Sequence, residues 1–284
     1  MVSFKGQAVV VTGAGGGLGR AYALRIAALG GSVVVNDLGG TGSAAHQVAE
    51  EIRRAGGEAV AVGGSVSDPQ AATALIETAL QAYGRIHALI CNAGIVQDKS
   101  FAKMTPESFR AVLDVHIMGS YYPIAAAWPA MRQAEYGRIV MTTSHAGLYG
   151  NFGQANYSTA KMSLVGLVNT LSIEGTPRNI RVNAIAPVAA TPMTSAGLPE
   201  DLRAKLDPEF AATAVSYLAS ESCDFSGDVI VAAGGHYSRA QMFESDGVRF
   251  DAPPGVAEFA SALGRIRDMT DAHDGKLTNF SWRN

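Results

Sequence analysis

The stretch VTGAGGGLGRAYAL, residues 11–24, decides how this chain folds. It continues an apolar run, 7–12, that is typical of a β-strand, and it leads into the helical spacing of 17–29. The chain must turn tightly between these two elements, and glycines let a pyrophosphate approach the backbone at the N-terminus of the helix. Glycine also marks plain turns, so the position between a strand and a helix is what favours a dinucleotide site. The glycines concerned are Gly13, Gly17 and Gly19.

Strand-like and helical segments alternate along the first 235 residues. Near-continuous apolar strands indicate burial on both faces, as in a parallel sheet covered by helices. We therefore expect one doubly wound α/β Rossmann domain over residues 1–235, with a seven-stranded parallel sheet and helices on both faces. The expected strands are 7–12, 32–37, 58–63, 86–92, 138–144, 180–186 and 228–233, and the expected helices are 17–29, 43–55, 68–82, 106–133, 155–174 and 200–220.

Residues 236–284 form a C-terminal extension beyond the last expected strand. Its first part, 237–254, is expected to be a loop, and 255–268 has the spacing of a helix with one apolar face. An apolar face needs a partner, so the extension either packs on its own domain or covers an active site, which could be that of a neighbouring subunit. The residues of this face are Val256, Phe259, Leu263 and Ile266.

The composition of the chain excludes some classes of binding partner. The 284 residues carry a formal net charge of −3 without a run of like charges, which argues against a nucleic-acid or anionic membrane surface. No apolar segment is long enough to span a bilayer and the N-terminus lacks a signal peptide, so we expect a cytoplasmic protein that acts on a small molecule. Cys91 and Cys223 are the only cysteines, and neither a disulfide framework nor a metal site is expected.

The two long helices expected at 106–133 and 155–174 carry small and apolar residues on more than one face. More apolar surface than one sheet face can cover suggests packing across a symmetry axis. We therefore expect a homodimer or a homotetramer. The residues that carry this argument are Ala125, Ala126, Ala127, Leu164, Val165 and Val168.

An acidic residue closes the second expected strand, in VVNDLGG. Asp37 stands where a carboxylate can accept hydrogen bonds from the adenosine ribose hydroxyls, and its charge would repel a 2′-phosphate. No Lys or Arg adjoins it, so NAD is favoured over NADP. Two alternatives stay open, namely that Asp37 is a turn former before Gly39, or that Arg20 reaches the 2′ position.

The ends of further strands converge on the same rim of the sheet. Strand four ends in small residues that would let the adenine–ribose side of a cofactor lie over it, namely Asn92, Ala93 and Gly94. Ser144 follows strand five, and Tyr157 and Lys161 lie one turn apart on the helix after it. Free tyrosine has a pKa of about 10, and a nearby ammonium is expected to lower it. Tyr157 then accepts a proton, while Ser144 holds the substrate oxygen.

Five motifs in order over residues 5–235 resemble those of the short-chain dehydrogenase/reductase family: TGAGGGLG, the acid after strand two, CNAG, Ser144, and Tyr157-x-x-x-Lys161. NDLGG and YGNFGQANYS are similar to the (3R)-hydroxyacyl-CoA dehydrogenase units of type 2 multifunctional enzymes, which are also described as 17β-hydroxysteroid dehydrogenases. The resemblance implies an NAD-dependent dehydrogenase of secondary alcohols, with Ser144, Tyr157 and Lys161 as catalytic residues.

The resemblance also implies roles for further residues. His116 takes the place of an asparagine that holds a relay water, and a pKa of about 6.5 would make such a relay pH-sensitive; the alternative is a hydrogen-bonded core histidine. Beside Ser144, His145 either faces the substrate or is a loop histidine, and Tyr149 and Phe152 either wall the substrate pocket or pack beneath the loop. Ser65 replaces a common aspartate, and Pro187-Val188 replaces Pro-Gly. The implied cofactor contacts are Gly13, Gly17, Leu18, Gly19, Asp37, Leu38, Ser65, Val66, Asn92, Ala93, Gly94, Tyr157, Lys161, Pro187, Val188 and Thr191.

Three functions remain open at this point. The first is oxidation of a (3R)-3-hydroxyacyl-CoA, the second is oxidation of a hydroxysteroid or a steroid-CoA ester, and the third is non-catalytic NAD binding. The segment 192–207 has little apolar bulk, which suits an open cleft better than a closed sterol pocket. Arg203 and Lys205 are its candidates for CoA phosphates, or they lie on a solvated helix face.

Overall fold

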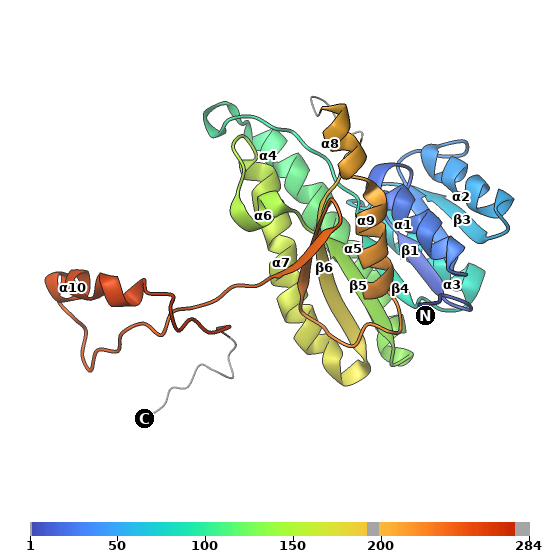
Figure 1. Ribbon diagram of the computed structural model, residues 1–284. Helices are drawn as coiled ribbons and strands as arrows, with labels where there is room; N and C mark the ends of the chain where they lie inside the picture. Colours follow the sequence, from blue (N-terminus) through green and yellow to red (C-terminus); the bar gives the residue numbers. More distant parts are fainter. Residues whose placement is uncertain (1, 192–198, 276–284) are drawn as a thin grey trace. The chain divides into compact units, whose positions relative to one another are not determined.

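The computed structural model describes residues 2–191 and 199–275. The described residues form an eight-stranded sheet with the order β3-β2-β1-β4-β5-β6-β7-β8 (Figure 1). The strand pairs from β3 across to β7 are parallel. The strands are β1 (Ala8–Val11), β2 (Ser32–Asp37), β3 (Glu58–Gly63), β4 (Ala88–Cys91), β5 (Gly137–Thr142), β6 (Ile180–Val188), β7 (Val229–Ala233) and β8 (His236–Ala240).

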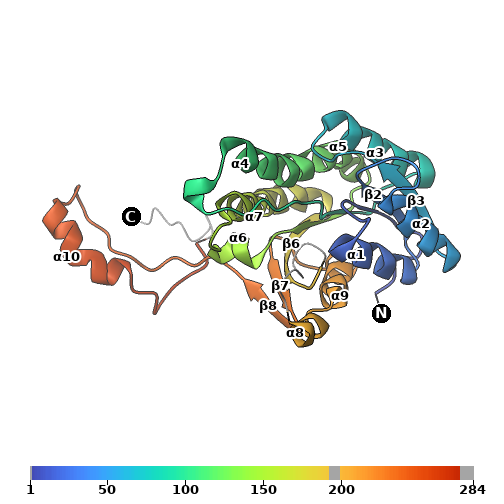
Figure 2. The ribbon, with the colours of Figure 1, turned by 90° about the horizontal axis from the view of Figure 1, so that it is seen from above.

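Helices cover both faces of the sheet (Figure 2). One face carries α1 (Gly17–Ala28), α2 (Ala44–Arg54) and α9 (Pro208–Leu218), and the other carries α3 (Pro69–Tyr83), α4 (Pro106–Leu113), α5 (Gly119–Gln133) and α7 (Ala155–Gly175). The expected α/β Rossmann class is confirmed. The shorter elements of this part are α6 (His145–Tyr149), α8 (Glu200–Lys205), the 3₁₀ turns η1 (Phe101–Lys103) and η3 (Thr176–Arg178), and a π-helical turn η2 (Asp114–Met118).

The central strands form because their residues are apolar and β-branched and are buried on both sides. All four residues of β1, AVVV, and all four residues of β4, ALIC, are buried. Helix starts are set by local chemistry: the Asp68 carboxylate accepts hydrogen bonds from the N–H groups of Gln70 and Ala71, and Pro69 opens α3. Gly84 ends that helix in the left-handed conformation.

The sheet differs from the expectation by one strand. Residues 237–240 of β8 fall in the stretch 237–254 that the sequence pattern assigned to a loop, so that assignment is wrong over its first four residues. Gly234 and Gly235 both have positive φ and connect β7 to β8 in two residues, which is typical of a tight hairpin. The pattern was missed because β8 is largely exposed and lacks an apolar run.

Two expected helices are each divided. The helix expected at 106–133 widens into the π-helical turn η2 between α4 and α5. The helix expected at 200–220 is divided at Asp207, whose carboxylate accepts a hydrogen bond from the Glu209 N–H and starts α9.

The chain divides into two compact units, Met1–Arg239 and Ala240–Asn284. The second unit contains α10 (Val256–Ile266), and its Glu244 and His273 pair in a short antiparallel bridge. None of the residues of α10 is buried, so its apolar face has no cover in the described structure. That this unit covers an active site stays a prediction. No helix among the described residues is long and apolar enough to cross a membrane.

Most of the residues taken to indicate a symmetry axis pack inside the chain itself. Ala127, Leu164, Val165 and Val168 are buried in the monomer, so that part of the argument is wrong. Ala125 is exposed on α5. Larger exposed apolar side chains on these helices are Tyr121 and Ile173.

The buried centre of the sheet predicts a specific loss of stability. Met141 in β5 is 0% exposed, so Met141→Ala should lower the free energy of unfolding by about 2–5 kcal/mol, because it leaves a cavity. Met242 is 61% exposed, and Met242→Ala should change it by less than about 0.5 kcal/mol. Urea unfolding of both variants checks this; equal effects would contradict the described core.

Candidate active site

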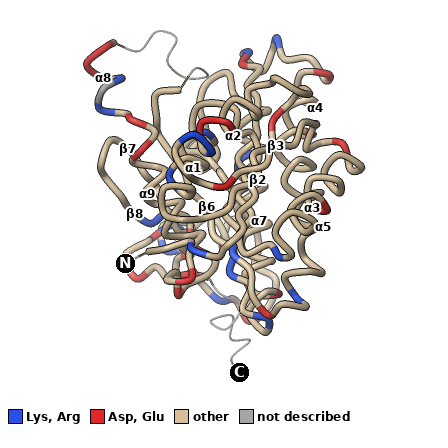
Figure 3. Tube along the Cα trace, turned by 90° about the vertical axis from the view of Figure 1, so that its right-hand side faces the viewer, with Lys and Arg blue, Asp and Glu red and all other residues tan. Residues whose placement is uncertain are grey.

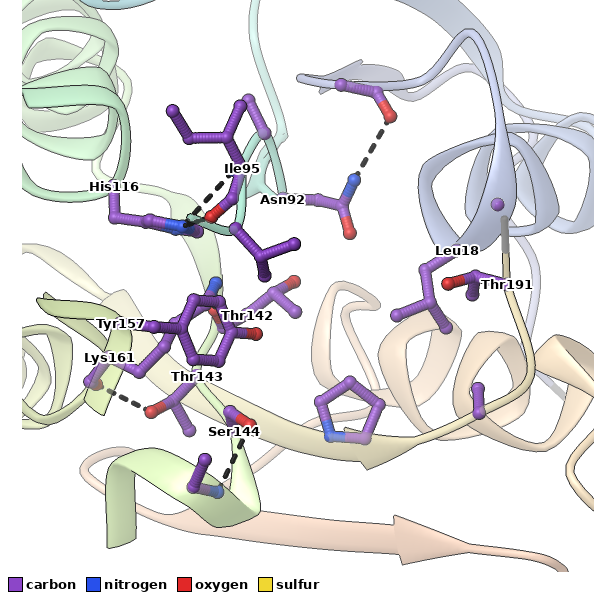
Figure 4. Close-up of a pocket in the computed structure, with 18 of the residues that line it drawn as sticks. Leu18, Asn92, Ile95, His116, Thr142, Thr143, Ser144, Tyr157, Lys161 and Thr191 are labelled. Carbon is purple, nitrogen blue, oxygen red and sulfur yellow. Dashed lines mark hydrogen bonds between the residues drawn. The ribbon is translucent and has the colours of Figure 1, made fainter. Parts of the chain in front are cut away.

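One cavity of about 1420 Å³ lies at the carboxyl ends of the parallel strands. Residues that follow β1, β2, β3, β4, β5, β6 and β7 all contribute to its lining, as does α7. Figure 4 shows His116, Ser144, Tyr157 and Lys161 around this space, with Leu18 and Thr191 on its other side. This is the rim at which open α/β sheets bind ligands.

The glycine turn after β1 packs directly on the end of β4. Gly13 has φ +60°, and a Cβ there would lie 2.6 Å from Ala93 Cα. The Asn92 side-chain amide donates to the carbonyl oxygens of Thr12 and Gly13, both at 3.1 Å. A Cβ at Gly19 would lie 2.1 Å from the Gly13 carbonyl oxygen. Asn92 and Gly19 therefore hold the turn in shape, and Gly19 does not line the cavity.

The start of α1 fits a pyrophosphate. No side chain caps this helix at Gly16, so its first N–H groups face the cavity without a side-chain acceptor. A Cβ at Gly16 would meet nothing within 4 Å, which leaves open space beside these N–H groups. The helix N-terminus adds a partial positive charge that favours a phosphate.

Asp37 is fixed at the end of β2 by two backbone groups. Its Oδ2 accepts from the Gly15 N–H at 2.8 Å, and its Oδ1 accepts from the Leu38 N–H at 2.7 Å. Each oxygen keeps a lone pair for a further donor such as a ribose hydroxyl. A Cβ at Gly15 would lie 2.7 Å from Asp37 Oδ2. Gly15 does not itself line the cavity, but its N–H holds the Asp37 carboxylate. The glycine spacing missed Gly15 because a side chain there is excluded by Asp37 at the end of β2 and not by the turn itself.

Arg20 does not stand free beside this carboxylate. Its Nη2 donates to both Glu51 carboxylate oxygens, at 2.6 and 2.7 Å. Among the described residues that line the cavity, Lys161 is the only Lys or Arg. Along the described part of the trace, acidic and basic residues are interspersed (Figure 3).

The remaining expected cofactor residues line the same cavity. Ser65 bonds Ser67 through their hydroxyls at 2.8 Å, and Val66 is buried with its Cγ2 2.6 Å from where a Gly119 Cβ would be. The lining includes Gly13, Gly17, Leu18, Asp37, Leu38, Ser65, Val66, Asn92, Ala93, Gly94, Tyr157, Lys161, Pro187, Val188 and Thr191. Part of the segment 192–207, residues 192–198, lies outside the described residues.

Ser144, Tyr157 and Lys161 meet at one end of the cavity. Ser144 caps α6, where its Oγ accepts from the Ala146 N–H at 3.2 Å. Lys161 is 3% exposed, and its Nζ donates to the Thr142 carbonyl oxygen at 2.6 Å. The same Nζ lies 5.5 Å from the centroid of the Tyr157 ring. The helix thus places the phenol and the ammonium beside each other at the end of β5.

Burial sets the protonation of this group. Burial raises the pKa of Tyr157, and the Ser144 hydroxyl, by hydrogen bonding, partly offsets this. Burial lowers the pKa of Lys161 to about 7. Without a cofactor the pKa of Tyr157 is thus raised by burial, and that Lys161 lowers it stays a prediction.

His116 lies on the π-helical turn η2, which directs its ring inward. The ring is 1% exposed and packs edge-on against Tyr157, with centroids 5.3 Å apart. Nε2 bonds the Ile95 carbonyl oxygen at 2.9 Å, whereas the buried Nδ1 has no partner among the described residues. Burial, and then Lys161, lower the pKa of His116 to about 3. A pKa this low keeps the ring neutral near pH 7, and the relay role of His116 stays a prediction.

Not all of the residues expected to contact the substrate line the cavity. Ser144 and His145 line the cavity, whereas Tyr149 lies outside its lining and packs its ring 4.6 Å from that of His145. Sequence reasoning missed His236 and Ser238, which reach the cavity from β8, and also Asp98, Asn151 and Gln154 at its other end. His236 and Ser238 were missed because the sequence pattern did not predict β8. Asp98 lies in a loop without a sequence signal, whereas Asn151 and Gln154 belong to YGNFGQANYS, whose resemblance did not say which of its residues face the cavity.

The contact between Gly15 and Asp37 predicts a binding defect. Gly15→Ala places a methyl against Asp37 Oδ2 and breaks a hydrogen bond to a charged group, worth about 1.5–3 kcal/mol. Affinity for NAD should fall about tenfold or more. Gly40→Ala, where a Cβ meets nothing within 4 Å, is the matched control. Calorimetric titration checks both, and equal affinities would refute this geometry.

Comparison with known proteins shows the family of this chain. The family model described as short chain dehydrogenase matches residues 7–201. A short-chain type dehydrogenase/reductase of Mycobacterium tuberculosis is 49% identical over 99% of both chains. The structure of full-length peroxisomal multifunctional enzyme type 2 from Drosophila melanogaster is similar with a TM-score of 0.84 and 40% identity, covering 98% of this chain and 48% of that one.

This chain therefore spans about half the length of the Drosophila enzyme. A 7α-hydroxysteroid dehydrogenase complexed with NADH and 7-oxo glycochenodeoxycholic acid is similar with a TM-score of 0.76 and 29% identity, covering 82% of this chain and 95% of that one. The family match and the site geometry lead to the same conclusion. The chain belongs to the short-chain dehydrogenase family and is an oxidoreductase of that family.

Proposed function

We propose that this protein is an NAD-dependent dehydrogenase that interconverts a (3R)-3-hydroxyacyl-CoA and a 3-oxoacyl-CoA. The observation that carries the proposal is the placement of Tyr157 next to both Ser144 and the buried Lys161, in a cavity that also contains the glycine turn. This is the set of groups that proton transfer to or from an alcohol requires. A purely NAD-binding role leaves the buried Lys161 and the unpartnered His116 Nδ1 without explanation.

In the oxidative direction, Tyr157 accepts the proton of the substrate hydroxyl, and the Ser144 hydroxyl donates a hydrogen bond to the substrate oxygen. When bound, oxidised nicotinamide supplies the acceptor for the hydride and a positive charge that favours the tyrosine phenolate. Lys161 keeps a proton donor beside Tyr157, and the neutral His116 offers Nδ1 as an acceptor for a relay water. Reduction runs the same proton path in reverse.

The choice of NAD rests on charge. Asp37 faces the cavity with lone pairs to spare, while Arg20 is bonded to Glu51. A 2′-phosphate would meet the Asp37 carboxylate without a cation to offset it. The residues that would hold the rest of the cofactor are those of the glycine turn and the ends of β4 and β6.

The substrate class is supported by the similarity to peroxisomal multifunctional enzyme type 2. The second candidate is a hydroxysteroid, favoured by the similarity to a 7α-hydroxysteroid dehydrogenase. We also propose a homodimer or homotetramer, because Tyr121, Ala125 and Ile173 are exposed on the long helices. The cytoplasm stays a prediction, since the named relative is peroxisomal.

Removal of the phenol should stop the reaction. Tyr157→Phe takes away the proton acceptor, and kcat should fall by a factor of about 10²–10⁴ or more. Affinity for NAD should stay within about twofold, because the ring and its packing on His116 remain. Absorbance of the reduced nicotinamide measures kcat, and calorimetry measures binding. Turnover near that of the parent would sink the mechanism.

Removal of the Asp37 charge should relax the choice of cofactor. Asp37→Ala and the isosteric Asp37→Asn both remove the repulsion toward a 2′-phosphate. The ratio of kcat/KM with NAD to kcat/KM with NADP should fall by about tenfold or more in both. Steady-state rates with each cofactor measure the ratio. An unchanged ratio in both variants would contradict the assignment of NAD to this carboxylate.

A further inference from the structure

Two phenylalanines stand in solvent beside the cavity. Phe101 is 79% exposed and Phe152 is 89% exposed, which makes them the most exposed large apolar side chains in the described part of the first unit. Phe101 belongs to η1, between β4 and α4, and Phe152 follows α6; in Figure 1 these two loops lie side by side. Large aromatic rings exposed on two loops that are bonded to each other can together form an apolar binding surface.

Hydrogen bonds clamp the two loops together. The Lys99 N–H donates to the Gly153 carbonyl oxygen at 2.8 Å, and the Gln154 side-chain amide donates to Asp98 Oδ2 at 2.8 Å. The Asn156 amide adds a bond to the carbonyl oxygen of the residue before Asp98, at 3.1 Å. The surface that carries the two rings is therefore formed in advance, and a ligand would not have to order it.

The cavity runs into this surface. Asp98, Gly150, Asn151 and Gln154 belong to the same two loops and line the cavity that holds Tyr157. A ligand whose reactive end lies at Tyr157 and whose other end leaves the cavity on this side would pass over the loops. Such a ligand needs a long connecting arm and an end group that suits aromatic rings.

The charges beside the rings are those that suit phosphates. Lys99 and Lys103 flank Phe101, and both are exposed. Among the described residues, no carboxylate bonds the ammonium group of Lys99 or of Lys103. The described residues contain five lysines in all. Asp98, next to Lys99 in the chain, accepts a hydrogen bond from the Gln154 side-chain amide, and hydrogen bonds at the start of α4 lower the pKa of Glu107.

We propose that Phe101, Phe152, Lys99 and Lys103 form a nucleotide shelf for the adenosine 3′-phosphate 5′-diphosphate end of coenzyme A. This inference rests on the proposed function, because the acyl thioester would reach Tyr157 through the cavity. Adenine stacks on exposed aromatic faces, and ammonium groups offset phosphate charge. The shelf then gives the enzyme its affinity for a CoA thioester over the same acyl group on a shorter carrier.

The test compares two substrates that differ in this end group alone: 3-hydroxybutyryl-CoA and the 3-hydroxybutyryl thioester of pantetheine. In Phe101→Ala/Phe152→Ala and in Lys99→Gln/Lys103→Gln, kcat/KM for the CoA thioester should fall about tenfold. With the short thioester it should change by less than about twofold, because that substrate has no nucleotide. Lys5→Gln, at an exposed lysine before β1, is the matched control.

Equal losses with both thioesters, or no loss with either, would overturn the shelf. A third substrate, the same hydroxyacyl group carried on acyl-carrier protein, separates a protein partner from a nucleotide. If kcat/KM of the double variants falls with this substrate alone, the surface binds a protein instead. If the parent enzyme turns over neither thioester, the proposed function fails, and calorimetric titration with free CoA still decides the shelf. The shelf is supported if the parent binds free CoA and the affinity is about tenfold lower in both double variants. It is rejected if the parent does not bind free CoA, or if all three proteins bind it equally.

Discussion

A buried lysine held by a backbone carbonyl is the contact on which the site depends. Lys161 Nζ donates to the Thr142 carbonyl oxygen at 2.6 Å, and the Thr143 hydroxyl donates to the Lys161 carbonyl oxygen at 2.6 Å. A Cβ at Gly147 would lie 2.6 Å from Lys161 Cβ, so α6 packs closely against the same residue. These contacts allow α7 one position at the end of β5. Tyr157, one turn earlier on α7, is fixed with it.

The other half of the site is joined to this one through the end of β4. Asn92 bonds that end to the glycine turn. The absence of a side chain at Gly94 leaves room for the His116 ring, since a Cβ at Gly94 would lie 2.2 Å from His116 Cε1. His116 in turn packs against Tyr157. The cofactor end and the catalytic end are therefore parts of one packed structure. A change in the π-helical turn η2 would therefore alter the cofactor end and the catalytic end together.

The sequence was sufficient for the features that repeat a strong local pattern. Apolar strands and helical spacing predicted the α/β class, and motif spacing placed Asp37 and Tyr157 on one cavity. The features that were missed depend on tertiary context. Gly15 is required by a carboxylate from another strand, β8 is exposed and has no apolar run, and the pKa of Tyr157 is set by burial that no spacing reveals.

The central claim is that Lys161 is buried with its pKa lowered to about 7 by burial alone. An unfolded lysine has a pKa of about 10.4, so between these values the unfolded chain binds more protons, and stability rises with pH. The direct test is urea unfolding of the parent and of Lys161→Met at several pH values from about 7 to 10. The account predicts that the free energy of unfolding rises more steeply with pH in the parent. Equal slopes would contradict it.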